Sequence, residues 1–160
     1  MTATEKVQLC NRLFVRSMVA EDVQLTTVGN NNEAMNTLVA DRLALTASQL
    51  ADIKLIILDP AARFRGGDEN SNPHATRFVQ ALEKLVKQTG ATVLIAHHAS
   101  KASAYSGEAT QHASRGASAL TDGIRLQLAL SPLNQKHKLY VAMSDDDRRN
   151  HLELSVAKTN

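Results

Sequence analysis

Four consecutive large aliphatic residues, Leu55-Ile56-Ile57-Leu58, most limit how this chain can fold. Lys54 precedes them, and Asp59-Pro60 follows. A short, continuous aliphatic run predicts a strand that is buried on both faces, as in parallel sheets that are covered by helices. The sequence therefore favours an α/β fold that is organised around this strand.

A second run of small and β-branched residues, 91–96, leads directly into His97-His98. Between the two runs, Asn72-Pro73 predicts the start of an amphipathic helix, and Gly90 predicts its end as a left-handed cap. Strand, helix and strand then form a βαβ unit whose strands run parallel. We therefore expect Asp59 and the histidine pair at one sheet edge, the edge where ligands bind in open α/β sheets.

The polar residues that follow the two strands, Asp59 and His97-His98, each have a catalytic and a purely structural interpretation. An aliphatic run that is closed by Asp59 fits the Walker B pattern, whose carboxylate holds Mg²⁺ beside nucleotide phosphates. The same run also fits a buried strand that ends in a turn-forming Asp-Pro. The pair His97-His98 could act on a ligand, or it could form a capped, hydrogen-bonded pair at a strand end.

Composition limits the class of protein. With 160 residues, of which 43% are hydrophobic, the chain can form one domain with a substantial core. The net charge of +2 does not by itself indicate a nucleic-acid or membrane partner. A single cysteine, Cys10, suits the reducing cytoplasm, and no segment approaches the roughly 20 apolar residues that span a bilayer.

The remaining segments carry weaker patterns. Residues 99–118 are small and polar without an apolar face, residues 132–147 fit either helix or strand, and Asp145-Asp146-Asp147 predicts a solvated turn rather than a metal site. Further expected elements are a helix over 2–18, a strand over 23–28 before a turn at 29–32, a short strand over 43–45, a short helix over 117–122, a strand over 124–130 parallel to the first two, and a strand over 152–156.

Seven short motifs recur in the same order in one known group of ATPases. They are Leu58-Asp59-Pro60, Arg63-Phe64, Glu69-Asn70, His97-His98-Ala99-Ser100-Lys101, Ala113-Ser114-Arg115-Gly116-Ala117-Ser118, Asp122-Gly123-Ile124-Arg125 and Val156-Ala157-Lys158. From about residue 10 to residue 160, the chain resembles the hexameric replicative helicase of broad-host-range plasmids and the related phage and plasmid ATPases of RecA-like fold.

The resemblance implies a nucleotide site that binds ATP and Mg²⁺. Asp59 would be the Walker B carboxylate and metal ligand, and one or both of His97 and His98 would sense the γ-phosphate. Arg12 matches an arginine near the site. For Arg63 and Arg65, which follow Asp59 in a polar loop, solvation is a simpler role than phosphate binding.

The resemblance also implies partners. Arg125 would be an arginine finger that reaches a neighbouring subunit, and Lys158 would point across the same interface, although both could be exposed charges at strand ends. The segment 100–116 would line a channel for single-stranded nucleic acid, with Lys101, Gln111 and Arg115 as its contacts.

One departure from this family matters for activity. Phosphate binding in RecA-like ATPases depends on a P-loop, G-x-x-x-x-G-K-[ST], and none of the seven glycines begins one. Family members carry the P-loop and a catalytic Glu upstream of the matching part. We therefore expect residues 1–160 to form one RecA-like core, three-layered with a mainly parallel sheet, that is truncated at its N-terminal P-loop subdomain. A truncated gene product, an excised piece and a degenerate homologue all fit this expectation.

Three functions remain open at this point. The first is an ATPase of the replicative-helicase type that is inactive alone because the Walker A lysine is missing. The second is a non-catalytic subunit that self-associates or supplies Arg125 and Lys158 to P-loop-bearing ATPase subunits. The third is a metal-dependent hydrolase that uses Asp59, His97 and His98.

Overall fold

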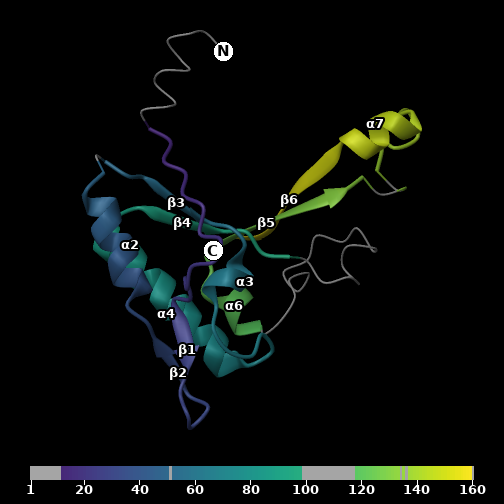
Figure 1. The fold of residues 1–160 in the computed structure, drawn as a ribbon. Helices are drawn as coiled ribbons and strands as arrows, with labels where there is room; N and C mark the ends of the chain where they lie inside the picture. The colour runs from purple at the N-terminus through teal and green to yellow at the C-terminus, as the bar shows by residue number, and fades with distance from the viewer. Residues whose placement is uncertain (1–11, 51, 99–117, 134, 136, 160) are drawn as a thin grey trace.

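The computed structural model describes residues 12–50, 52–98, 118–133, 135 and 137–159 (Figure 1). Within this part the strands pair as three two-stranded sheets, β1–β2, β3–β4 and β5–β6. The elements in chain order are β1 (Thr26–Val28), β2 (Ala34–Asn36), α2 (Val39–Ser48), β3 (Leu55–Leu58), α3 (Ala61–Phe64), α4 (Asn72–Thr89), β4 (Thr92–Ile95), α6 (Ser118–Gly123), β5 (Leu126–Pro132), α7 (Asp145–Asn150) and β6 (Leu152–Thr159).

The predicted βαβ unit is present as β3, α4 and β4. The two strands are parallel, and Leu55 lies opposite Thr92 and Leu58 opposite Ile95. The prediction of parallel pairing is therefore confirmed, and both strands deliver the chain to the same sheet edge.

Helix α4 begins and ends close to the predicted positions. Its N-cap is Ser71 rather than Asn72, and the Ser71 hydroxyl accepts a hydrogen bond from the backbone N–H of His74 at 3.4 Å. Gly90 ends the helix with a φ of 70°, a left-handed conformation that costs glycine little. The Asn72 side chain instead accepts a hydrogen bond from the backbone of Ala119 at 3.2 Å, which joins α4 to α6.

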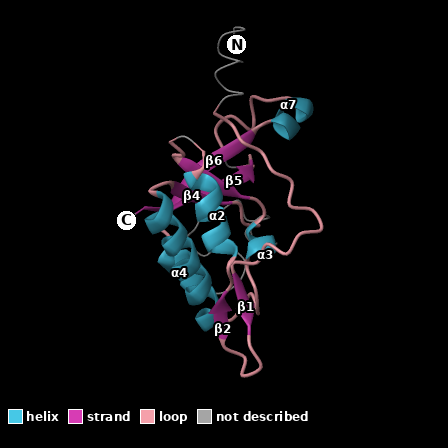
Figure 2. Ribbon diagram, turned by 60° about the vertical axis from the view of Figure 1, so that its left-hand side comes forward, coloured by secondary structure: helices cyan, strands magenta, loops and turns pink. Residues whose placement is uncertain are grey.

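The core lies around the inner face of α4. Helices α2 and α4 lie side by side (Figure 2), and α6 packs against the same helix. The apolar stripe of α4 contributes five of the eleven buried side chains of the core cluster, more than any other element. The core cluster consists of Val23, Leu25, Ala40, Leu58, Phe64, Ala75, Phe78, Val79, Ala81, Leu82 and Leu120.

The β3–β4 sheet is covered on one face only within the described residues. Ile56, Val93 and Ile95 pack against the core, whereas Leu55 is 50%, Ile57 55% and Leu94 48% exposed. The expectation that the first strand is buried on both faces is wrong, because the described helices leave its second face uncovered.

The strand predicted over 124–130 is present as β5, but its expected parallel position is wrong. It pairs antiparallel with β6, with Leu128 opposite Val156 and Leu130 opposite Leu154. The pair forms a ribbon that extends away from the α2–α4 body, with α7 near its far end (Figure 1). Antiparallel pairing satisfies the backbone N–H and C=O groups along the shared edge of the two strands. The described part therefore does not form a single, mainly parallel sheet.

Three other local predictions differ from the structure. Residues 12–18 of the predicted 2–18 helix are not helical, and residues 1–11 lie outside the described part. Residues 43–45 belong to α2, because a short apolar run fits a helix as well as a strand. Residues 145–147 form the first turn of α7, where the Ser144 hydroxyl caps the helix.

The sequence predicts a short helix over 117–122 and a strand over 152–156, and α6 and β6 occupy these positions with slightly different ends. Residue 117 itself lies outside the described residues. Among the described residues, no helix combines the length and apolarity that a membrane crossing requires.

Candidate functional site

The carboxyl ends of β3 and β4 bring the predicted site residues to one edge. The backbone N–H of Ala96 donates to the carbonyl of Leu58 at 3.0 Å, and that of Ala61 donates to the carbonyl of Ala96 at 2.7 Å. These bonds fix the chain on either side of Asp59 beside the chain that enters His97. The predicted juxtaposition of Asp59 and the histidine pair is confirmed at the level of the backbone.

A cavity of about 250 Å³ lies at this edge. Both histidines line this cavity, whereas Asp59 is exposed and does not line it. Its volume is below the roughly 300–1,000 Å³ of pockets that hold drug-sized molecules, so it suits one small chemical group. The lining residues are Ala61, Ala62, Arg65, Gly67, Glu69, Phe78, His97, His98 and Leu120.

The His97 ring has one nitrogen engaged by the backbone. Its Nδ1 lies 2.9 Å from the carbonyl oxygen of His98. Because a carbonyl only accepts, Nδ1 carries the proton in this arrangement. The other nitrogen, Nε2, is then an acceptor in the neutral ring and a donor in the protonated ring.

Arg65 is the unexpected member of this site. Its residue surface is only 8% exposed, so the prediction of a solvated loop arginine is wrong. Nη2 donates to the carbonyls of Asp68 at 3.3 Å and Glu69 at 3.0 Å. Nε and Nη1 are buried, and neither has a hydrogen-bond acceptor among the described residues. Burying a charged group without enough hydrogen-bond acceptors destabilises the folded protein, so Arg65 marks a position where acceptors are missing among the described residues.

Burial lowers the pKa of the Arg65 guanidinium, while the nearby carboxylates of Glu69 and Asp68 act in the opposite direction. Arginine stays protonated in proteins even so. The side chain is therefore a positive charge held inside the protein.

The loop of residues 65–71, here called the Arg65 loop, is fixed at two further points. The backbone N–H of Gly66 donates to the Thr26 hydroxyl at 3.1 Å, which ties the loop to β1. The backbone N–H of Asp68 donates to His74 Nδ1 at 3.0 Å, and His74 Nε2 lies 3.0 Å from the carbonyl oxygen of Asn32. His74 is buried and uses both ring nitrogens as a neutral side chain, so its role is to hold the loop.

Sequence reasoning missed Arg65 because loop arginines are normally solvated. The available signal was local: Gly66-Gly67 follows the arginine directly and lets the backbone fold closely around it. The hydrogen bond to Thr26, 40 residues earlier, has no counterpart in any local pattern.

The residues expected to act between subunits lie away from the cavity. Arg125 is exposed between α6 and β5. The Lys158 ammonium donates to the carbonyls of Thr121 at 3.0 Å and Asp122 at 2.9 Å, at the end of α6. Arg12 is exposed and does not line the cavity. The expected nucleic-acid contacts Lys101, Gln111 and Arg115 lie outside the described residues.

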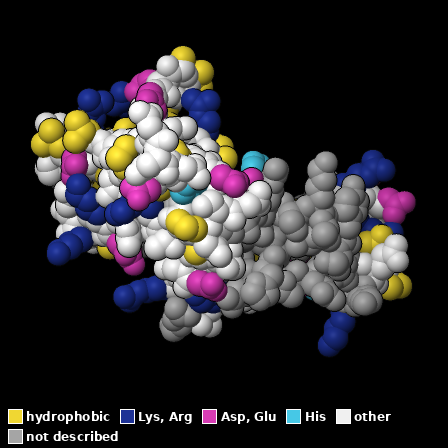
Figure 3. Space-filling model, turned by 90° about the horizontal axis from the view of Figure 1, so that it is seen from below, with side chains coloured by type: hydrophobic (Ala, Val, Ile, Leu, Met, Phe, Trp, Pro, Cys, Tyr) yellow, Lys and Arg dark blue, Asp and Glu magenta, His cyan; other side chains and the backbone are white. Residues whose placement is uncertain are grey.

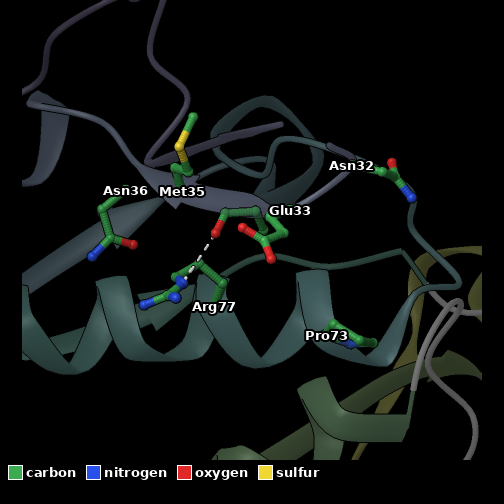
Figure 4. A pocket seen from close by; sticks show the side chains of 7 residues that line it. Asn32, Glu33, Met35, Asn36, Pro73 and Arg77 are labelled. Atoms are coloured by element: carbon green, nitrogen blue, oxygen red, sulfur yellow. Dashed lines mark hydrogen bonds between the residues drawn. The ribbon is translucent and has the colours of Figure 1, made fainter. Parts of the chain in front are cut away.

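A second hollow of about 690 Å³ lies between β2 and the start of α4 (Figure 4). Arg77 crosses it, and its Nε donates to the carbonyl of Ala34 at 3.2 Å. Its other lining side chains, which include Asn32, Glu33, Met35 and Pro73, are mostly exposed. Although this hollow is larger, its polar groups are not brought together by buried contacts, so the 250 Å³ cavity is the better candidate site.

No group of three or more His, Cys, Asp or Glu side chains that could hold a metal ion occurs among the described residues. Asp59, His97 and His98 all belong to that part of the chain, and they do not form such a group. Acidic and basic side chains are interspersed over the face that Figure 3 shows, with no extended region of one sign. The described side chains on that face form no continuous basic surface of the kind typical of non-specific nucleic-acid binding.

Comparison with models of known protein families places this part of the chain in a family. A family model described as an AAA domain matches residues 2–104, which include β3, α4, β4, Asp59, the Arg65 loop and both histidines. No solved structure matches the chain significantly.

Proposed function

The chain belongs to the AAA domain family, and we propose that it is a RecA-like ATPase-type core related to replicative helicases. Asp59, His97 and His98 would serve the phosphate end of a nucleotide. The observation that carries this proposal is the parallel pairing of β3 and β4, which delivers Asp59 and the histidine pair to one sheet edge.

The residues fit part of an ATP–Mg²⁺ site. Exposed Asp59 is a hard oxygen ligand of the kind that Mg²⁺ prefers, and the cavity with Arg65 and the histidines suits a phosphate group. The sequence contains no P-loop to hold the remaining phosphates. Bound ATP–Mg²⁺ would supply the phosphoryl group and its bridging metal, and this chain's own contribution would be Asp59, the histidines and a shielded cavity wall.

The chain on its own should therefore bind nucleotide weakly. Without the P-loop amides and lysine, Asp59 faces the phosphates as a negative charge, which a loosely held Mg²⁺ offsets only in part. We expect a Kd for ATP–Mg²⁺ above about 1 mM, a binding free energy of at most roughly 4 kcal/mol. We expect phosphate release that equals that of an Asp59→Ala variant.

Calorimetric titration with a slowly hydrolysed ATP analogue, together with phosphate-release assays of both proteins, tests this expectation. Micromolar binding, or turnover that disappears in Asp59→Ala, would show that another segment replaces the P-loop. The inactive-alone part of the proposal would then be wrong, while the assignment of Asp59 would gain support.

A second candidate function follows from the exposure of Arg125. The chain would act as a non-catalytic subunit that associates with itself or with P-loop-bearing ATPase subunits and supplies Arg125 to their nucleotide. Lys158 is a weaker candidate for the same role, because its ammonium is already bound by two carbonyls of its own chain. Single-stranded nucleic acid would be the cargo of such an assembly, in contact with Lys101, Gln111 and Arg115.

Mixing the chain with a P-loop-bearing ATPase separates these functions. A subunit that acts in trans raises the partner's phosphate release, and Arg125→Ala removes the increase. Exposed Arg149 in α7 offers a matched control, since Arg149→Ala removes the same charge elsewhere. An increase that survives Arg125→Ala would exclude Arg125 as the residue responsible.

A metal-dependent hydrolase is disfavoured, since Asp59, His97 and His98 do not gather as a metal site.

A further inference from the structure

The Arg65 guanidinium is oriented by the protein but only partly paired. Two loop carbonyls accept hydrogen bonds from Nη2, while Nε and Nη1 are buried and find no acceptor in the part of the chain that the structure describes. The arginine also forms part of the wall of the 250 Å³ cavity. A buried arginine without acceptors for two of its nitrogens is unusual in a folded protein, because such groups normally find a partner.

The cavity contains the other groups that an anion would need. His97 and His98 share its wall with Arg65, and Ala61, Ala62 and Gly67 leave the space between them free of bulky side chains. The Gly67 backbone has a φ of 84°, and a Cβ at this position would lie 2.7 Å from His74 Nδ1, so a larger residue does not fit there. The packing of the Arg65 loop against His74 therefore requires that Gly67 has no side chain, which keeps this part of the cavity open.

We infer that Arg65, with His97 and His98, forms a binding site for a single oxyanion, of the size and charge of a phosphate group. Guanidinium nitrogens match the spacing of phosphate and carboxylate oxygens, and each such bond is stronger when both partners are charged. The oxyanion would supply the acceptors that Nε and Nη1 lack, and Arg65 would turn toward it as it binds.

One acidic residue of the cavity wall opposes this binding. Glu69 also lines the cavity, and its carboxylate acts on Arg65 electrostatically. It therefore competes with an incoming anion for the same positive charge. Removing the Glu69 charge should therefore strengthen oxyanion binding.

The inference deepens the proposed function, on which the identity of the oxyanion as a nucleotide phosphate rests, whereas phosphate binding at Arg65 is tested separately from nucleotide binding. Inorganic phosphate is a sufficient probe, and its binding is measured without ATP, Mg²⁺ or turnover. A chain without any nucleotide affinity would still bind phosphate at Arg65 if the inference is correct.

The experiment is an NMR titration of the whole chain with inorganic phosphate, following the Arg65 Nε–H signal and the ring signals of His97 and His98. We expect all three to shift along one saturable curve. Arg65→Met should weaken phosphate binding at least about tenfold, and Arg65→Lys should restore only part of it, because lysine lacks the planar pair of donors. Glu69→Gln should bind phosphate more tightly than the wild type.

The matched control is Arg63→Gln, which removes an exposed arginine from the same segment that does not line the cavity. Equal loss in Arg63→Gln and Arg65→Met would show that only the general positive charge matters, which overturns the inference. So would histidine shifts that persist unchanged in Arg65→Met, or an Arg65 Nε–H signal that does not respond to phosphate.

A parallel titration with acetate identifies the oxyanion. Saturable binding of phosphate that is tighter than that of acetate supports a phosphate site, whereas tighter acetate binding overturns the phosphate assignment. Far-ultraviolet circular dichroism of each variant confirms that it is folded. If Arg65→Met does not fold, the Glu69→Gln and Arg65→Lys affinities decide the question.

Discussion

Gly66 sets how closely the Arg65 loop can pack on β1. A Cβ at this position would lie 2.7 Å from the carbonyl carbon of Thr26 and closer still to its oxygen. The obstacle is backbone rather than a flexible side chain, so it cannot rotate away. Gly90 presents the opposite case, since its φ is 70° but nothing lies within 4 Å of a Cβ there.

We expect Gly66→Ala to destabilise the protein by about 3 kcal/mol or more, at the upper end of the cost of overpacking. Gly90→Ala should cost about 1–2 kcal/mol, because it introduces only a left-handed non-glycine residue. Urea unfolding followed by circular dichroism measures both. If Gly66→Ala is as stable as Gly90→Ala, the contact with Thr26 does not limit this loop.

Helices α2 and α4 are joined by a polar cluster at their exposed side. The Asp41 carboxylate in α2 accepts hydrogen bonds from Lys84 Nζ at 2.9 Å and from Gln88 Nε2 at 2.9 Å, both in α4. These hydrogen bonds, that from Lys84 first, lower the pKa of Asp41 from its ordinary value of 3.8. Both partners of the Asp41–Lys84 pair are partly exposed, so solvent screens the interaction and its contribution is small.

The sign of the resulting pH dependence follows from this lowered pKa. The stabilisation is fully present above the unfolded pKa of about 3.8 and is lost as the pH falls through the lower folded-state pKa. We expect Asp41→Asn to be less stable than the wild type at neutral pH, and the difference to vanish in acid. Urea unfolding across this pH range measures the difference.

Glu83→Gln provides the control on the same helix, because Glu83 is exposed and does not take part in the cluster. It should show no comparable difference at either pH. A difference for Asp41→Asn that stays constant down to pH values well below 3.8 would contradict the assigned role of its carboxylate.

The elements that could be predicted from sequence are those whose signals are local. Helix α4 combines an apolar stripe with Pro73 at its start and Gly90 at its end, and the aliphatic runs of β3 and β4 define strands. No local pattern determines the pairing of β5, because an alternating strand fits a parallel or an antiparallel neighbour, and the parallel prediction failed because β5 pairs with β6, the next strand along the chain. The burial of Arg65 and the Asp41–Lys84 pair likewise depend on contacts across about 40 residues.

At the scale of the whole molecule, two apolar surfaces remain uncovered by the described residues. One is the outer face of β3–β4, with Leu55, Ile57 and Leu94. The other is one face of the β5–β6 ribbon, where Leu128, Leu130, Leu154 and Val156 lie opposite one another in register and are largely exposed. Contiguous exposed aliphatic side chains on strands favour association with another protein surface. This arrangement agrees with the proposed partners, a second copy of the chain or a P-loop-bearing subunit.

We therefore expect the chain to sediment as a dimer or larger species at tens of micromolar. Ile57→Glu and Leu130→Glu each place a charge on one of the two apolar surfaces, and at least one of them should shift the protein toward monomer without loss of helix content. Leu45→Glu is the matched control, because Leu45 is an exposed leucine on α2 that belongs to neither surface. Its sedimentation should match that of the wild type. A wild-type monomer at these concentrations, or an equal effect of all three substitutions, would mean that neither strand surface is an association surface, because a specific interface must depend on where the charge is introduced.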